Sequence, residues 1–146
     1  MSRTSLPGLM AAVVLLSLSG CALAPPSAVS DAEARSRFIA VLDETQRVVG
    51  GDWDVQDDPT PRECVIPLWV SGQRYPALRV GEASRSVEQT VDDVEQVWLD
   101  AGMSVERSLI GDVVELKASS DDGELYLFRV SESAATLQGE SECRPR

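Results

Sequence analysis

The spacing of apolar residues changes at Met103, and this change restricts the possible folds more than any other feature of the sequence. Before Met103, two stretches repeat apolar residues every three or four positions, which is typical of amphipathic helices. After Met103, apolar and polar residues alternate, which is typical of strands that bury one face. Helices followed by a run of strands predict an α+β fold with the helices on one side of the sheet.

The first helix is predicted over residues 31–49. Ser30 and Glu33 have the spacing of a capping box, and Gly50-Gly51 ends the helical pattern. The apolar stripe of this helix should face the core, and it consists of Phe38, Val41, Leu42, Thr45, Val48 and Val49.

The second helix begins after a cap at Ser84 or Ser86 and ends at Ala101-Gly102. Its apolar residues are spaced four, three, four and three positions apart, which places them on one face of a helix. That stripe consists of Val87, Val91, Val94, Trp98 and Ala101.

The remaining apolar stretches predict strands. Residues 75–80 predict a short strand, whereas Pro67 predicts that the apolar 65–70 stretch is an edge strand or a packed loop. Asp122-Gly123 is a strong hairpin signal within a meander of strands at about 103–109, 112–119, 124–131 and 135–142. The predicted fold is α+β: two helices packed on one face of a four- to five-stranded, mainly antiparallel sheet, in the order α-β-α-β-β-β-β.

Residues 1–20 have the pattern of a secretory signal peptide. Arg3 is the only charged residue, and an apolar run extends from Leu6 to Leu18. Its length fits a signal core of about 7–15 residues and falls short of the ~20 needed to span a membrane. Cleavage by an ordinary signal peptidase after Ala24, or retention as a single membrane-spanning anchor, are two open interpretations of this leader.

Leu18-Ser19-Gly20-Cys21 resembles the lipobox of bacterial lipoproteins, which is a third interpretation of the leader. The resemblance implies that the Cys21 thiol receives a diacylglycerol, with palmitate as an expected acyl group, and that Cys21 becomes the first mature residue. It also implies a place on the extracytoplasmic face of the cell membrane. Pro25-Pro26 favours an extended tether over 21–30, and the length of 31–146 predicts a single globular domain. With one lysine among 13 basic residues, the chain is similar to small lipoproteins of actinobacteria whose function is uncharacterised.

The pairing of the cysteines depends on that assignment. Of three cysteines, lipid on Cys21 leaves Cys64 and Cys143. Because an exported domain lies in an oxidising compartment, we expect these two to form a disulfide. A free buried thiol and a metal site are the alternatives, although a chain without histidine offers few metal ligands.

The acidic charge excludes some partners. The chain has 13 basic and 24 acidic residues, a net charge of −11, and removal of residues 1–20 takes away only Arg3. We expect no binding to nucleic acid, because that requires a basic surface. We expect the acyl chains at Cys21 to attach the domain to the membrane while its charge keeps the body in solution. Recognition of a cationic partner is the alternative explanation of the charge.

The sequence offers little for catalysis. Without histidine, catalytic triads and imidazole metal sites are not expected. Lys117 lacks a serine at the spacing of a Ser–Lys dyad, and Gly50-Gly51 lacks the rest of a phosphate-binding loop. Four carboxylates in residues 52–58 are a calcium candidate, but their spacing is not that of an EF-hand, and a solvated loop is predicted. We predict no catalytic, metal or cofactor-binding residues and no cofactor.

We therefore expect a membrane-anchored, non-catalytic protein that binds or scaffolds an unknown envelope protein. The alternative is a carrier of a small apolar ligand or lipid, with a pocket between helices and sheet near Trp53, Trp69 and Trp98. A well-filled interior favours the interaction protein, whereas an apolar pocket of several hundred Å³ favours the carrier. A hydrolase is the third class, and it requires two converging buried acids.

Overall fold

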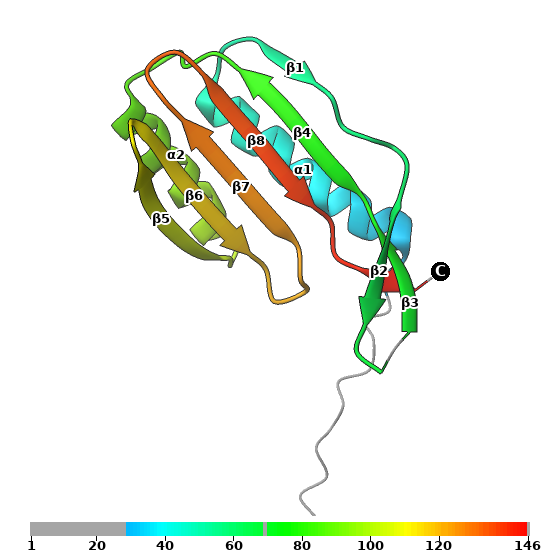
Figure 1. The fold of residues 1–146 in the computed structure, drawn as a ribbon. Helices are drawn as coiled ribbons and strands as arrows, with labels where there is room; N and C mark the ends of the chain where they lie inside the picture. Colours follow the sequence, from blue (N-terminus) through cyan, green and yellow to red (C-terminus); the bar gives the residue numbers. More distant parts are fainter. Residues whose placement is uncertain (1–28, 69, 146) are drawn as a thin grey trace, which may run out of the picture.

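The computed structural model describes residues 29–68 and 70–145. The predicted signal peptide, the predicted lipidation site at Cys21, and Trp69 lie outside the described residues. The described chain forms two antiparallel sheets and two helices, α1 (Asp31–Val49) and α2 (Val87–Asp100). Both helices pack on one face of the larger sheet (Figure 1), which confirms the predicted α+β fold.

The larger sheet has six strands in the order β1-β4-β8-β7-β6-β5. These are β1 (Trp53–Val55), β4 (Pro76–Gly81), β5 (Ser104–Ile110), β6 (Val113–Ser119), β7 (Leu125–Val130) and β8 (Ala135–Glu140). Strands β5 to β8 are the predicted meander, with each boundary within two residues of its expected place. The sequence does not predict β1, because a strand of three residues leaves no periodic signal.

A smaller sheet contains β2 (Arg62–Ile66), β3 (Val70–Arg74) and β9 (Arg144–Pro145), in the order β2-β3-β9. It projects from one end of the larger sheet, here called the hairpin end (Figure 1). The 65–70 stretch, predicted as an edge strand or a packed loop, is divided between two strands. Val65 and Ile66 end β2, which is an edge strand of the small sheet, and Val70 begins β3. Pro67 lies in the turn, where its missing N–H breaks no hydrogen bond between strands.

Each helix begins at a serine cap. Ser30 Oγ accepts a hydrogen bond from Glu33 N at 3.2 Å, and α1 has its predicted bounds. Ser86 Oγ accepts from Gln89 N at 3.3 Å, so Ser86 rather than Ser84 caps α2. Neither helix of the described chain is long and apolar enough to cross a membrane.

The core lies between the helices and the larger sheet. Trp98 of α2 is fully buried, and its Nε1 donates to Thr45 Oγ1 of α1 at 2.9 Å. The Tyr126 ring lies between two other rings, with its centroid 5.4 Å from that of Phe38 and 5.9 Å from that of Trp98. Gly139 lets Phe38 approach the sheet, because a Cβ there would lie 2.7 Å from Phe38 Cε2. Other fully buried apolar side chains are Leu42, Val91, Val94, Leu116, Phe128 and Leu137.

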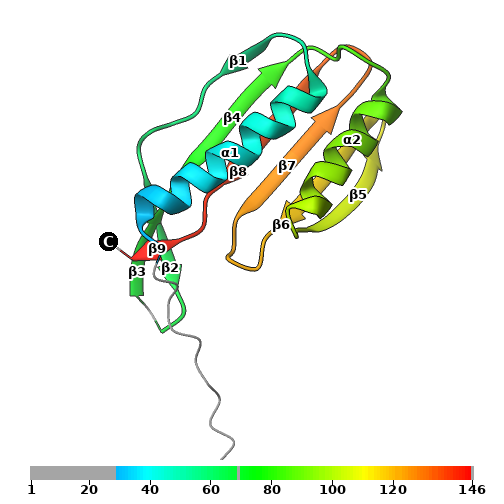
Figure 2. The ribbon, with the colours of Figure 1, turned by 180° about the vertical axis from the view of Figure 1, so that it is seen from behind.

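The first helix begins at the hairpin end. Asp31 Oδ2 accepts hydrogen bonds from Tyr75 OH at 2.9 Å and from Gln73 Nε2 at 3.2 Å. Helix α1 then runs along the larger sheet to its opposite end, here called the far end, where Gly81 pairs with Ala135 (Figure 2). The described chain therefore starts beside the projecting small sheet.

Candidate binding groove

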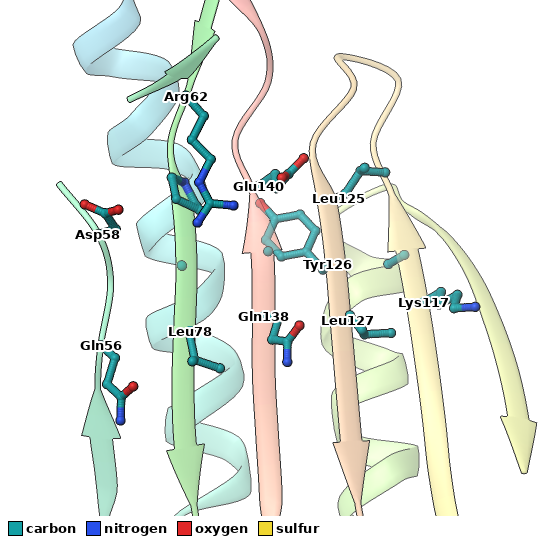
Figure 3. A pocket seen from close by; sticks show the side chains of 14 residues that line it. Gln56, Asp58, Arg62, Leu78, Lys117, Leu125, Tyr126, Leu127, Gln138 and Glu140 are labelled. Atoms are coloured by element: carbon teal, nitrogen blue, oxygen red, sulfur yellow. The ribbon is translucent and has the colours of Figure 1, made fainter. Parts of the chain in front are cut away.

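One face of the larger sheet carries no helix, as Figures 1 and 2 show from opposite sides. A groove of about 720 Å³ lies on this face near the hairpin end and crosses β4, β8, β7 and β6 (Figure 3). We call it the sheet groove. Its floor includes Pro76, Leu78, Leu125, Leu127, Gln138 and Glu140.

The strand register places the floor residues in two rows. One row crosses the four strands at Leu78, Gln138, Leu127 and Lys117. The next row, toward the hairpin end, contains Pro76, Glu140 and Leu125. The three leucines point away from the core, and Leu125 is 47% exposed. Together they form an apolar strip that a bound partner can remove from water.

The connection from β1 to β2 forms one wall of the groove. Gln56, Asp58 and Arg62 come from this segment (Figure 3). Asp58 Oδ1 accepts a hydrogen bond from Thr60 N at 2.8 Å, and this bond lowers the pKa of Asp58. The wall therefore presents an ionised carboxylate and, at the start of β2, a guanidinium.

A buried carboxylate orients the cation on the opposite side. The Glu115 side chain is 2% exposed, with Oε2 2.6 Å from Arg129 Nε and Oε1 3.1 Å from Lys117 Nζ. Hydrogen bonds from Arg129 and Lys117 hold the pKa of Glu115 below its usual range. Lys117 is 60% exposed, so its ammonium group remains accessible from the groove while Glu115 holds it in place.

This arrangement suits the binding of an amphipathic partner. The leucine strip supplies apolar contact, and the charged groups of both signs favour one orientation of the partner. Several of these charged side chains form ion pairs with neighbouring residues. For example, Glu140 Oε2 lies 2.7 Å from Arg74 Nη1. Among the described residues that line the groove there is no serine, threonine, cysteine or histidine. The groove offers apolar and charged surface to a bound partner.

Glu124 and Glu142 interact electrostatically near the hairpin end, and a hydrolase would need such a pair of acids. Burial raises the pKa of Glu124, and the charge of Glu142 adds to that rise. Burial and the neighbouring Glu124 likewise raise the pKa of Tyr126. However, Glu142 forms an ion pair with Arg144 at 2.7 Å, in which both side chains are nearly buried. That carboxylate therefore has a structural partner.

The two described tryptophans lie away from the sheet groove. Trp98 fills the core, and its indole is held by Thr45. Trp53 is half-buried against Gly81 at the far end, and its Nε1 donates to Gly50 O at 2.8 Å. The space around Trp98, where a carrier pocket was one expectation, is occupied by side chains. The groove instead lies on the opposite face of the sheet.

The acidic 52–58 segment was predicted as a solvated loop, but its residues 53–55 form β1. Most of the segment is exposed, and Asp57 is an exception. Its side chain is 15% exposed, and its Oδ2 lies 2.8 Å from Nη2 of the buried Arg79 on β4. Asp57 therefore ties the loop after β1 to the core of the fold. Within residues 29–68 and 70–145, no three His, Cys, Asp or Glu side chains are grouped to hold a metal ion.

Cys64 and Cys143 form a disulfide, which confirms the predicted pair. Their Cα atoms lie 6.0 Å apart, and the bond joins β2 to the segment immediately before β9. Gly72 of β3 lies opposite Cys64 in the strand register. A Cβ at Gly72 would lie 2.6 Å from Arg144 O and 2.8 Å from Cys143 Sγ, so a glycine here lets β9 and the disulfide approach β3 closely.

One sequence signal for the groove exists in β7. Residues 125–128 read Leu-Tyr-Leu-Phe and are apolar on both faces of the strand. A strand that buries only one face alternates apolar and polar residues, so Leu125 and Leu127 indicate a second apolar surface. The rest of the groove is formed by residues far apart in the sequence, and no local sequence pattern reveals it.

No protein family model matches this chain, and no curated protein matches its sequence. Its fold resembles the crystal structure of a DUF4853 family protein from Actinomyces odontolyticus, with a TM-score of 0.59 and 20% sequence identity. The similarity covers 83% of this chain and 72% of the other chain. At this identity it shows a shared fold alone.

Proposed function

We propose that this protein is a bacterial lipoprotein held at the extracytoplasmic face of the cell membrane through Cys21. In this proposal its sheet groove binds another protein of the envelope, without catalysis. One observation carries the binding role: three leucines bordered by oriented charges lie on the sheet face that neither helix covers. The lipobox resemblance at Leu18-Ser19-Gly20-Cys21 supports the anchor.

The filled core favours a protein partner at the surface over a small ligand bound inside the domain. Trp98, Phe38 and Phe128 are fully buried between the helices and the sheet, so a ligand has to bind at the surface. A protein segment with apolar residues flanked by charges matches the sheet groove, because Lys117 and Asp58 each find a counterpart of opposite sign.

A small apolar ligand or lipid is the second candidate. The groove volume of about 720 Å³ lies within the range of about 300–1,000 Å³ that is common for small-molecule sites. Its leucine floor suits an acyl chain or another apolar group.

The anchor predicts a specific N-terminus. Protein extracted from membranes should begin at a Cys21 that carries acyl groups, because two or more chains are needed for stable attachment. Mass spectrometry of the N-terminal peptide checks this result. A Cys21→Ala variant, expressed alongside, should lose both the acyl mass and membrane attachment. An unmodified N-terminus at Pro25 would contradict the anchor.

The binding role predicts a position-specific cross-link. A photoreactive amino acid in place of Leu127, in the groove floor, should give one discrete protein adduct in intact cells. The matched control is the same replacement at Leu109, which is 71% exposed at the far end of β5, and it should give none. An adduct with the mass of a lipid favours the second candidate. Equal labelling at both positions would exclude the groove as the binding surface.

A further inference from the structure

The tip of the β2–β3 hairpin is apolar and exposed. Val65 is 68% exposed, Leu68 is 75% and Val70 is 45%. The sequence has no charged residue from Cys64 to Gln73, although 25% of the whole chain is charged. We call Val65, Ile66, Pro67, Leu68 and Val70 the hairpin tip. An uncharged projection on so acidic a protein indicates contact with something apolar.

The backbone at Leu68 is also unusual. Its φ is 73°, in the left-handed region that residues with bulky side chains rarely occupy. Glycine or asparagine would adopt this turn with less strain and without an exposed apolar side chain. Leucine is therefore disfavoured here both by backbone conformation and by hydration. The stability of the turn itself therefore does not explain a leucine at position 68. A contact outside the domain explains it.

Apolar side chains occur on both faces of the hairpin. The register pairs Ile66 with Val70 and Val65 with Ser71. Because successive strand residues point to opposite faces, Val65 lies on the face opposite Ile66 and Val70. A protein lying against one face would leave the other in water. Insertion into a lipid surface removes both faces from water.

We propose that the hairpin tip inserts into the surface of the membrane that holds Cys21, so that the domain has two membrane contacts. This inference rests on the proposed lipid anchor. Helix α1 begins beside the hairpin, where Asp31 bonds Gln73 of β3. Val70 lies three residues before Gln73 on β3, toward the tip, so the two residues are about 10 Å apart. Residues 21–28 can span at most about 28 Å, which is enough for Cys21 and the tip to reach one surface.

Insertion has to be shallow. The turn at residues 67–68 lies outside the paired strands, and unpaired backbone groups require water or lipid headgroups. The uncharged length from Cys64 to Gln73 sets the limit of entry. With this end at the membrane, the far end of the larger sheet points away from the lipid, and the sheet groove remains open at the side.

Hydrogen exchange tests the proposal. The lipidated protein in vesicles of phosphatidylethanolamine and phosphatidylglycerol is compared with a lipid-free Cys21→Ser chain. Amides of residues 65, 66 and 68–71 should exchange about tenfold more slowly in the vesicles, since burying one leucine is worth at least a factor of ten. Leu68→Asp should remove this protection, and aspartate tolerates the positive φ. Leu109→Asp, at the far end, should leave it unchanged.

The outcomes separate this proposal from the anchor. If Cys21 is lipidated and exchange at the tip is the same with and without vesicles, insertion is wrong and the anchor stands. If Cys21 is unmodified, the anchor is wrong. Slower exchange of the Cys21→Ser chain on adding vesicles would then still support contact between tip and lipid. Protection that grows with protein concentration in the absence of vesicles identifies a second copy at the tip and overturns lipid insertion.

Discussion

Loss of the Cys64–Cys143 disulfide should lower the free energy of unfolding by about 4 kcal/mol. The bond joins residues 79 positions apart, so it excludes many conformations of the unfolded chain. Domains of this size are stable by about 5–15 kcal/mol in total, and the loss is a large part of that. We therefore expect a Cys64→Ser/Cys143→Ser variant to melt roughly 15 °C lower than the oxidised protein.

The small sheet should weaken first. Strand β9 has two residues, and it pairs with β3 only at Gly72–Pro145 and Gln73–Arg144. Without the disulfide, few contacts hold this strand, and amides of β3 should exchange before the larger sheet opens.

Urea unfolding followed by circular dichroism measures the loss. Reducing agent should destabilise the wild type and leave the double-serine variant unchanged, which separates the bond from side effects of substitution. A difference below about 1 kcal/mol between the oxidised protein and the variant would contradict the entropic estimate.

Replacing Arg79 by alanine should destabilise the fold by about 3 kcal/mol. The Arg79 side chain is 3% exposed and forms ion pairs with Asp57 at 2.8 Å and with Asp43 at 2.7 Å. It also donates a hydrogen bond to Gln46 Oε1 at 3.0 Å. Asp43 is 64% exposed, so water can replace its partner. Asp57 is 15% exposed and would keep a poorly hydrated charge without a cation. The larger part of the loss therefore comes from Asp57.

Arg107→Ala is the matched control, because Arg107 is 41% exposed and pairs with Asp92 at 3.0 Å. Loss of that exposed pair should cost less than about 1 kcal/mol. Adding Asp57→Asn to Arg79→Ala should recover part of the stability, since it removes the unpaired charge. Equal urea midpoints for Arg79→Ala and Arg107→Ala would show that the buried cluster contributes little.

The helices and the meander follow from local patterns. Ser30 and Gly50 bound α1 as predicted, because a cap and a terminating glycine act within one turn of the helix. The alternation after Met103 predicts β5 to β8, because a strand with one buried face repeats every two residues. The prediction of the disulfide rested on assigning Cys21 to lipid, which leaves two cysteines.

The β2–β3 hairpin and the Asp57–Arg79 pair do not follow from local patterns. Pro67 predicts that the 65–70 stretch is an edge strand or a packed loop, whereas in the structure its two ends belong to β2 and β3, which pair with each other. Asp57 belongs to an acidic run that indicates a solvated loop. Its partner Arg79 lies on a different strand, and nothing near Asp57 in the sequence indicates that pairing.

The sequence by itself determined the two helices and the meander, because caps and periodicity act over a few neighbouring positions. The cysteine pair was expected only through the lipobox resemblance at Cys21. Only the tertiary structure decided that the sheet face without helices carries a groove, and that an apolar hairpin tip projects beside the start of α1. These features join residues distant in the chain, and their positions depend on packing and strand register.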